Sequence, residues 1–202
     1  MSSEHLNQCK KLLRQRLLAQ RQTLSPIQWR QKSDRLCHAL KVSGVLTAQP
    51  WGSTLLAYFS TKREPDLSPL FDSASGEWRW GFPRCEGKTL QWHAWSSGAA
   101  LENNRYGIPE PRPNVPKIEA IEVGLILVPA IACDLRGYRL GYGGGYYDRL
   151  LGQPAWAQIP TVGIVFAEGL LPQVPVAPWD KPLDMVCTDE GLHCAKGRSH
   201  FH

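Results

Sequence analysis

Leucines recur at helical spacing near the start of the chain. Leu6, Leu13 and Leu17 predict a helix from about residue 4 to residue 20. Lys10 and Arg14 lie four residues apart within it, so both side chains can project from the same face of the helix.

The start of a second helix is marked by its capping residues. Ser25 fits the N-cap, Pro26 the first helical position, and Gln28 the partner of Ser25 in a capping box. Leu36 and Leu40 continue the apolar stripe of this helix.

Shorter apolar runs follow, and they predict strands at residues 54–59, 77–82, 90–95, 123–128 and 161–166. Short helices are expected at 66–74 and 146–151, and residues 42–53 and 103–116 are expected as loops. Helices that alternate with apolar strands predict an α/β protein, a single three-layer α/β/α domain with a mostly parallel, Rossmann-like sheet. This domain is expected over residues 1–191, followed by a C-terminal tail at residues 192–202.

The composition agrees with one globular domain. The chain has 202 residues, 43% hydrophobic and 20% charged, which is enough for one substantial core. No apolar run approaches the roughly 18 residues of a membrane span, and no secretory signal is evident. We therefore expect a cytoplasmic protein that does not contact membranes.

Positive charge is concentrated at the start of the chain. The net charge is +5, but residues 1–41 alone carry nine lysines and arginines against Glu4 and Asp34. Such a basic segment attracts polyanions, and nucleic acid, ATP or a polyglutamate chain would all fit. Nucleic acid is not expected, because aromatic residues are not interleaved with these charges for base stacking.

The six cysteines are scattered and form no C-x-x-C pair, which indicates reduced thiols rather than a disulfide scaffold or zinc ribbon. Cys187, His193 and Cys194 lie close together in the sequence. A weak metal-binding tract is one interpretation of these three residues, and polar residues of a loose tail is the preferred one.

A glycine-rich segment between a predicted strand and a predicted helix carries the clearest chemistry. It runs from Arg139 to Asp148 with the sequence RLGYGGGYYD. Its four glycines allow the backbone to bring several N–H groups close to an anion. A helix start stabilises one anionic group by only about 0.3–1 kcal/mol, so cations such as Arg139, Lys10 and Arg14 would have to contribute. The segment lacks the Gly-Lys-Ser/Thr ending of a Walker A loop, and a plain turn remains the alternative.

The segment from Val128 to Arg149, VPAIACDLRGYRLGYGGGYYDR, closely resembles the signature of the 5-formyltetrahydrofolate cyclo-ligase family, also called methenyltetrahydrofolate synthetases. Further motifs resemble those of the family in the same order along the chain: KKLLR at 10–14, YGIPEP at 106–111, WD at 179–180 and TDEG at 188–191. The resemblance therefore covers nearly the whole sequence.

This resemblance implies an enzyme that uses ATP to cyclise 5-formyltetrahydrofolate to 5,10-methenyltetrahydrofolate, with release of ADP and phosphate. Arg139 and Asp148 would be catalytic, and Mg²⁺ would bind Asp148 and Asp180. The implied ATP-binding residues are Lys10, Lys11, Arg14, Arg139, Gly141, Tyr142, Gly143, Gly144, Gly145, Tyr146 and Tyr147. The implied folate-binding residues are Phe59, Glu64, Tyr106 and Tyr146.

Each of these residues also has a simpler interpretation. Lys10 and Arg14 would form a solvated helix face, Glu64 a weak surface ion pair and Phe59 a core residue. Taken singly, most would favour that interpretation, and the order of the motifs along the chain favours function.

The sequence departs from the family pattern at Ala130, where many members have glycine, and at Cys133, where many have an aromatic residue. We expect these departures to affect the shape of the pterin pocket more than the class of reaction. Three rival functions stay open: a nucleotide-binding module without folate chemistry, a nucleic-acid binder, and a sugar-phosphate isomerase of similar architecture.

Overall fold

The computed structural model describes residues 3–71, 78–105 and 107–196. Its main element is a seven-stranded sheet in the order β12-β11-β9-β6-β1-β2-β3. The inner strands run parallel, while β3 and β12 at the two edges run antiparallel to their neighbours. The strand bounds are β1 Thr54–Leu56, β2 Arg79–Glu86, β3 Thr89–Trp95, β6 Val123–Pro129, β9 Thr161–Ile164, β11 Met185–Thr188 and β12 Gly191–Cys194.

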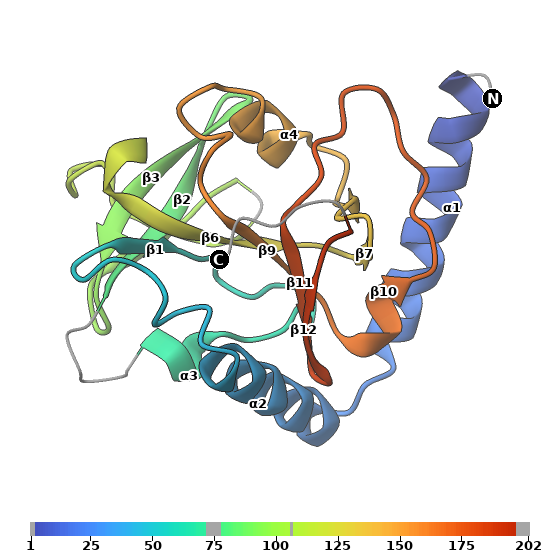
Figure 1. Ribbon diagram of the computed structural model, residues 1–202, viewed down its shortest axis with the longest axis horizontal. Helices are drawn as coiled ribbons and strands as arrows, with labels where there is room; N and C mark the ends of the chain where they lie inside the picture. Colours follow the sequence, from blue (N-terminus) through green and yellow to red (C-terminus); the bar gives the residue numbers. More distant parts are fainter. Residues whose placement is uncertain (1–2, 72–77, 106, 197–202) are drawn as a thin grey trace.

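Helices cover both faces of this sheet (Figure 1). Helices α2 (Pro26–Val42) and α3 (Ser68–Phe71) lie on one face, and α4 (Tyr146–Leu151) lies on the other. Alternate residues of β6 point to opposite sides: Leu125 and Leu127 pack in the core with α2, and Ile126 and Val128 pack in the core with α4. The expected three-layer α/β fold with a mostly parallel sheet is confirmed.

The expected helix starts are also confirmed. Helix α1 spans Ser3–Gln22. In α2 the backbone N–H of Gln28 donates to Oγ of Ser25 at 3.2 Å, and the N–H of Ser25 donates to Oε1 of Gln28 at 2.8 Å. These two reciprocal bonds form the capping box and satisfy N–H groups that the first helical turn cannot use.

Two smaller sheets fall in segments that the sequence predicts as loops or does not assign. One has the order β10-β7-β8, with bounds Leu170–Leu171, Ala132–Asp134 and Arg139–Leu140. It packs against α1 through a small apolar cluster that contains Leu17, Ala132 and Leu140. The other pairs β4 (Leu101–Asn103) with β5 (Pro109–Pro111), within and beside the expected loop 103–116.

The C-terminal segment corrects one expectation. Leu192, His193 and Cys194, expected in a tail, belong to β12 and pair with β11. Ala195 and Lys196 follow, and their backbone N–H groups donate to the carbonyl oxygens of Asp184 and Leu135, each at 2.8 Å. Residues 197–202 of the expected tail lie outside the described residues, as do residues 72–77 of the predicted helix and strand there.

Two 3-10 helices, Ala120–Glu122 and Ala167–Gly169 (η2), complete the elements of the described residues. Across the described ranges, no helix combines the length and the apolar character that crossing a membrane requires.

The strand order indicates where a ligand would bind. After β1 the chain crosses to β2 on one side, while β6 lies on the other side of β1. The chain therefore leaves the neighbouring strands β1 and β6 in opposite directions. At such a switch point the loops that follow β1 and β6 diverge, and a crevice is left at the carboxyl ends of these two strands. The loop after β1 contains Phe59 and Glu64, and the segment after β6 begins at Ala130.

Candidate functional site

The glycine-rich segment lies on the surface between β8 and α4. Gly143 and Gly145 have φ of 99° and 66°, values that side-chain-bearing residues rarely adopt. A Cβ atom added at Gly141 would meet nothing within 4 Å, and Tyr142, Gly143 and Gly144 are exposed. The loop is therefore free to approach a ligand. Because α4 has only six residues, charge from the helix itself contributes little here, and cations must supply most of the attraction.

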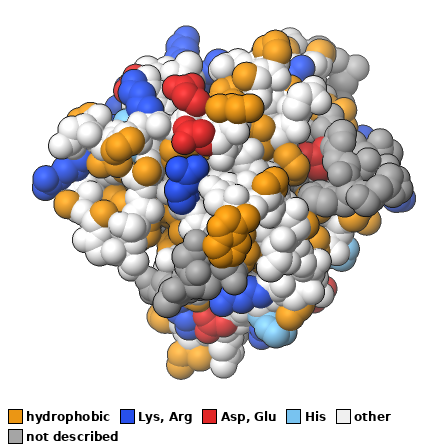
Figure 2. Space-filling view, turned by 60° about the vertical axis from the view of Figure 1, so that its left-hand side comes forward, with side chains coloured by type: hydrophobic (Ala, Val, Ile, Leu, Met, Phe, Trp, Pro, Cys, Tyr) orange, Lys and Arg blue, Asp and Glu red, His pale blue; other side chains and the backbone are white. Residues whose placement is uncertain are grey.

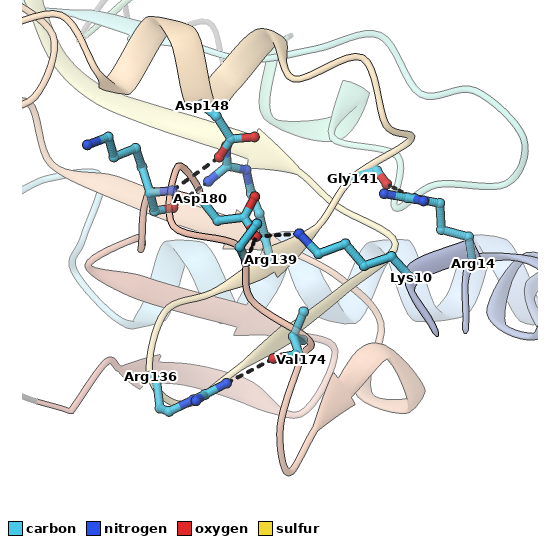
Figure 3. Close-up of polar contacts among 10 residues, drawn as sticks. Lys10, Arg14, Arg136, Arg139, Gly141, Asp148, Val174 and Asp180 are labelled. Carbon is cyan, nitrogen blue, oxygen red and sulfur yellow. Dashed lines mark hydrogen bonds and ion pairs between the residues drawn. The ribbon is translucent and has the colours of Figure 1, made fainter. Parts of the chain in front are cut away.

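Helix α1 brings two of these cations to the loop (Figure 3). Arg14 donates from Nε to the carbonyl oxygen of Gly141 at 2.7 Å. Lys10, one turn earlier, forms a largely buried ion pair with Oδ2 of Asp180. The expectation that Lys10 and Arg14 share a helix face is thus confirmed. Lys11 is exposed and has no hydrogen bond or ion pair within the described ranges.

Asp148 lies beside the same site, held by Arg139. Oδ1 of Asp148 accepts a bond from Nη2 of Arg139 at 2.8 Å and another from the backbone N–H of Lys181 at 3.1 Å. Nη1 of Arg139 donates to the carbonyl oxygen of Lys181 at 2.6 Å. Arg139 therefore ties the glycine loop and α4 to the loop that contains Asp180.

The two carboxylates fit a magnesium ion in their chemistry. Oδ2 of Asp180 accepts from Lys10 and from the backbone N–H of Ala177 at 2.7 Å. In the part of the chain that the structure describes, the second oxygen of each carboxylate, Oδ2 of Asp148 and Oδ1 of Asp180, receives no hydrogen bond. The described residues hold no group of three or more metal-ligating side chains. Two carboxylates suit Mg²⁺, which completes its shell with phosphate oxygens and water.

The two tyrosines that follow the glycines contact different parts of the protein. Tyr146 donates from its hydroxyl to the carbonyl oxygen of Gly87 at 3.2 Å, in the turn between β2 and β3. Tyr147 is half-buried and packs edge-on against Trp92 at 6.4 Å between ring centroids. Burial raises the pKa of Tyr147, so its hydroxyl is neutral at physiological pH. The Tyr147 side chain therefore supports the loop from the core side.

Glu64 occupies a buried position at the end of the loop after β1. Its Oε2 accepts from the backbone N–H and the hydroxyl of Thr61 at 2.9 and 3.1 Å. Burial raises the pKa of Glu64, although Thr61, Arg21 and Tyr142 oppose this shift. The preceding residues Lys62 and Arg63 have φ of 48° and 58°, which is a strained conformation for residues with side chains. The simple surface ion pair considered for Glu64 is therefore not what the structure contains.

Phe59 belongs to an aromatic cluster and is partly buried. Its ring stacks on Phe82 at 4.1 Å between centroids and meets Trp95 edge-on at 5.4 Å. Tyr106, the other expected wall of the folate pocket, lies outside the described residues.

Arg21 is a site residue that the sequence analysis did not identify. It donates from Nη2 to the hydroxyl of Tyr142 and from Nε to the carbonyl oxygen of Lys62 at 3.1 Å. It therefore connects α1, the glycine loop and the loop that holds Glu64. The only sequence signal was its place among the basic residues of α1.

A cavity of about 180 Å³ opens next to Arg21, between the second half of α1 and the ends of β6 and β9. Its lining comprises Leu17, Gln20, Arg21, Thr23, Leu24, Ala130, Ile131, Phe166, Glu168 and Gly169. Ala130, one of the departures from the family pattern, thus lines a cavity. Cys133, the other departure, is fully buried, and a Cβ atom at Gly163 would come within 2.8 Å of its Sγ. Cys133 therefore packs beneath the site and does not line it.

Charged side chains elsewhere are mixed in sign. On the face drawn in Figure 2, which brings β2 and β3 forward, the basic and acidic side chains of the described residues are interspersed with apolar ones. This face carries no continuous basic surface among the described residues.

Comparison with known proteins decides the family. The profile of the 5-formyltetrahydrofolate cyclo-ligase family matches residues 6–189. The chain belongs to this family. The resemblance inferred from the motifs is thereby confirmed.

Members of the family from several organisms align with the chain. The 5-formyltetrahydrofolate cyclo-ligase of Escherichia coli K12 is 32% identical over 148 residues, which cover 67% of this chain and 77% of the relative. That of Mycolicibacterium smegmatis is 39% identical over 100 residues, or 49% of this chain and 50% of the relative. The chain thus spans about half the length of this relative, and 45% of the Haemophilus influenzae relative.

The fold of a solved family structure agrees along almost the entire chain. The structure of 5,10-methenyltetrahydrofolate synthetase from Aquifex aeolicus superimposes with a TM-score of 0.80 at 32% identity, and the match covers 96% of each chain. Seen beside this structure, the α/β architecture of the chain is that of the family.

Proposed function

We propose that the protein catalyses the ATP-dependent cyclisation of 5-formyltetrahydrofolate to 5,10-methenyltetrahydrofolate, with release of ADP and phosphate. The observation that carries this proposal is the convergence of three segments on the exposed glycine loop. Lys10 and Arg14 come from α1, Arg139 and Asp148 from the two ends of the loop, and Asp180 from the segment before β11.

The reaction explains why the site needs alignment and charge rather than a protein nucleophile. The formyl oxygen is a weak nucleophile, and as an oxide it does not leave. Transfer of the γ-phosphoryl group of ATP to this oxygen, with departure of ADP, forms an imidate phosphate. The folate N10 then attacks the formyl carbon, and loss of the N10 proton and of phosphate yields the methenyl bridge. Holding the two substrates in line supplies most of the catalysis of such a step.

On the nucleotide side, the backbone N–H groups of the loop would bind phosphate oxygens. Arg14 and Lys10 would add positive charge at Gly141 and Asp180, where they already lie. Lys11, Tyr142, Tyr146 and Tyr147 complete the ATP-binding set in this proposal. Arg139 would hold Asp148 in place, and Asp148 with Asp180 would hold Mg²⁺. The ion would neutralise charge on the phosphates.

On the folate side, Phe59, Glu64, Tyr106 and Tyr146 would contact 5-formyltetrahydrofolate. Glu64 is buried, has a raised pKa and is linked to the glycine loop through Tyr142, so it is well placed to bond a pterin N–H group. The cavity beside Arg21 and Ala130 would take a part of the substrate, because it lies at the carboxyl ends of parallel strands.

The proposal also includes the cellular location and the partners of the protein. All six cysteines are unpaired, which is consistent with the reducing cytoplasm where ATP is abundant. Its partners would be small-molecule substrates, with no membrane and no nucleic acid.

The test is an assay of the full chain with ATP, Mg²⁺ and 5-formyltetrahydrofolate. We expect methenyl-folate absorbance to grow only when ATP is present, with one ADP formed for each product molecule. ATP binding without any methenyl product would support the nucleotide-binding module instead. Turnover of a sugar phosphate without ATP would support the isomerase. Salt-sensitive RNA or DNA binding with no turnover would support the nucleic-acid binder.

A further inference from the structure

Arg149, on α4, bonds to the carbonyl side of the glycine loop. It donates from Nη2 to the carbonyl oxygen of Gly144 at 2.7 Å. It also donates from Nε to the carbonyl oxygen of Lys88 at 2.6 Å. The guanidinium group lies over the ring of Tyr146, 5.3 Å from the centroid. None of the roles proposed above uses this arginine.

Arg149 packs closely against a glycine of the loop. A Cβ atom at Gly145 would lie 2.9 Å from Nη1 of Arg149, so the guanidinium group would have to shift from its present position. A Cβ atom at Gly144 would lie 2.8 Å from the ring of Tyr146. The absence of side chains at these two positions thus serves the close packing of Tyr146 and Arg149 as well as the conformation of the loop.

The bond to Gly144 has a consequence for the next N–H group. In a trans peptide, the carbonyl of one residue and the N–H of the following residue lie in one plane and point in opposite directions. With its oxygen held by Arg149, the peptide between Gly144 and Gly145 directs the N–H of Gly145 away from Arg149. A peptide between two glycines would otherwise turn over at small cost, because glycine accepts both signs of φ.

The bond to Lys88 holds the guanidinium group of Arg149 against a rigid part of the protein. Gly87 and Lys88 form the turn between β2 and β3, whose register runs without a break from Trp80 paired with Trp95 to Glu86 paired with Thr89. Tyr146 bonds to the carbonyl oxygen of Gly87 in the same turn at 3.2 Å. The loop is therefore braced against the edge of the main sheet.

We propose that Arg149 is a positioning residue for the triphosphate: it fixes the peptide between Gly144 and Gly145 so that the N–H of Gly145 faces the bound phosphates. Arg14 acts in the same way on the peptide that follows Gly141, from the opposite end of the loop. This inference rests on the proposed role of the loop as the ATP site.

A direct contact between Arg149 and a phosphate is the competing role, and two substitutions separate the two. Arg149→Lys keeps the positive charge but cannot bridge two carbonyl oxygens with one planar group. Arg149→Met keeps the apolar stem and loses both bonds. Arg79→Met is the matched control, because the exposed Arg79 also bonds a loop carbonyl, that of Gly52 at 3.2 Å, at the amino end of β2.

The experiment measures kcat, the KM for ATP and the KM for 5-formyltetrahydrofolate, together with the Kd for ADP by calorimetry. We expect Arg149→Met and Arg149→Lys alike to raise the KM for ATP and the Kd for ADP by about tenfold, the usual worth of one to two hydrogen bonds. The KM for the folate should stay within about twofold, and Arg79→Met should match the wild type in all four quantities.

Three results would overturn the inference: wild-type ADP affinity in Arg149→Met, near-wild-type affinity in Arg149→Lys with a loss only in Arg149→Met, or an equal loss in Arg79→Met. A melting temperature measured for each variant separates loss of binding from loss of fold. If the wild type binds ADP but forms no methenyl-folate, the proposed reaction fails, and the Kd values for ADP still test Arg149.

Discussion

The ammonium group of Lys10 on α1 lies against Oδ2 of Asp180, 170 residues further along the chain. Both side chains are largely buried, with exposed fractions of 10% and 11%. This ion pair closes α1 over the segment before β11 and places Lys10 at the same site as the glycine loop. The helix thereby serves the proposed ATP site with one cation on each side, Lys10 at Asp180 and Arg14 at Gly141.

Replacing Lys10 should separate its role in binding from its role in stability. Lys10→Met leaves Asp180 with a buried, unpaired charge, so we expect a loss of about 3 kcal/mol in the free energy of unfolding. We also expect the KM for ATP to rise by about tenfold, since one cation facing the phosphates is lost. Urea unfolding and steady-state kinetics measure the two effects. An unchanged KM for ATP would show that Lys10 only stabilises the fold.

The same variant tests the magnesium site without any turnover. Once Lys10 is gone, both oxygens of Asp180 are more accessible to a cation, so Mg²⁺ should raise the melting temperature of Lys10→Met more than that of the wild type. In Lys10→Met combined with Asp180→Asn, this additional gain should vanish. If the double variant responds to Mg²⁺ as strongly as Lys10→Met does, the ion binds elsewhere.

The sequence predicts those parts of the structure that depend on local patterns. The capping box at Ser25 and Gln28 follows from residue order alone because it is a motif of four residues, and strand β6 follows because its apolar run is long enough to recognise. Strands β7, β8 and β10 have only two or three residues each, too few for a period. The segment Met185–Thr188 is flanked by Asp184 and Asp189, so its apolar run is too short to predict a strand. The edge strand β12 cannot be told from a tail by its sequence, because it is recognised as a strand only through its pairing with β11.

In the candidate site, too, local motifs can be predicted from the sequence and contacts between distant residues cannot. The glycine loop and the spacing of Lys10 and Arg14 are visible in the sequence, since each is a short local motif. The link from Arg21 to Tyr142 joins residues 121 positions apart, and no local pattern encodes it. Arg149 directly follows the glycine-rich segment, but its proposed role depends on the carbonyl oxygen of Lys88, which only the folded chain brings near.

Arg139 and Asp148 should matter to turnover more than to the fold. Arg139→Ala removes the bonds to Asp148 and to the carbonyl oxygen of Lys181, and Asp148→Asn removes a negative charge from the proposed magnesium site. We expect each change to lower kcat/KM by about 100-fold or more, because misplaced groups lose most of the advantage of alignment. Circular dichroism should remain that of the wild type.

The control for Asp148→Asn is Glu102→Gln, which alters a carboxylate that forms a 2.7 Å ion pair with Arg84 away from the glycine loop. This control should keep wild-type kinetics. Near-normal turnover in both Arg139→Ala and Asp148→Asn would mean that the active site has been misassigned.

Glu64 should make stability depend on pH in a direction set by its burial. Its pKa is raised in the folded state, so the carboxyl group favours folding when it is protonated and this contribution is lost as pH rises through the folded pKa. Glu64→Gln keeps an acceptor for the N–H of Thr61 and never ionises. We therefore expect its melting temperature, relative to the wild type, to increase from pH 4 to pH 7. Glu4→Gln, at an exposed position on α1, should show no such trend.

The proposed folate contact gives Glu64→Gln a second readout. The KM for 5-formyltetrahydrofolate should rise by about tenfold or more, while the KM for ATP stays near the wild-type value. A rise in the KM for ATP alone would place Glu64 on the nucleotide side of the site, contrary to our proposal.

Asp189, directly after β11, connects α2 to η2 at the edge of the cavity. Its Oδ2 accepts from Lys32 at 2.6 Å and from Arg35 at 3.1 Å, and its Oδ1 accepts from the backbone N–H of Ala167 at 2.8 Å. Lys32 also pairs with Glu168, which lines the cavity, at 3.0 Å. Burial alone would raise the pKa of Asp189, but the bonds from Lys32, Ala167 and Arg35 together lower it.

Asp189→Asn should therefore destabilise the protein in a pH-dependent way. Because the folded pKa of Asp189 is depressed, its contribution is present above the unfolded value of about 4 and is lost as pH falls through the folded pKa. At pH 7 we expect a loss of about 2 kcal/mol, since Lys32 and Arg35 lose a charged acceptor and Lys32 keeps only the more exposed Glu168 as its partner. Urea unfolding from pH 7 to pH 3 should show the gap to the wild type closing below about pH 4. Asp34→Asn, which alters an exposed pair with Arg30 on α2, should leave a small gap at every pH. A gap for Asp189→Asn that stayed constant down to pH 3 would show that packing, not the charge of Asp189, holds α2 to η2.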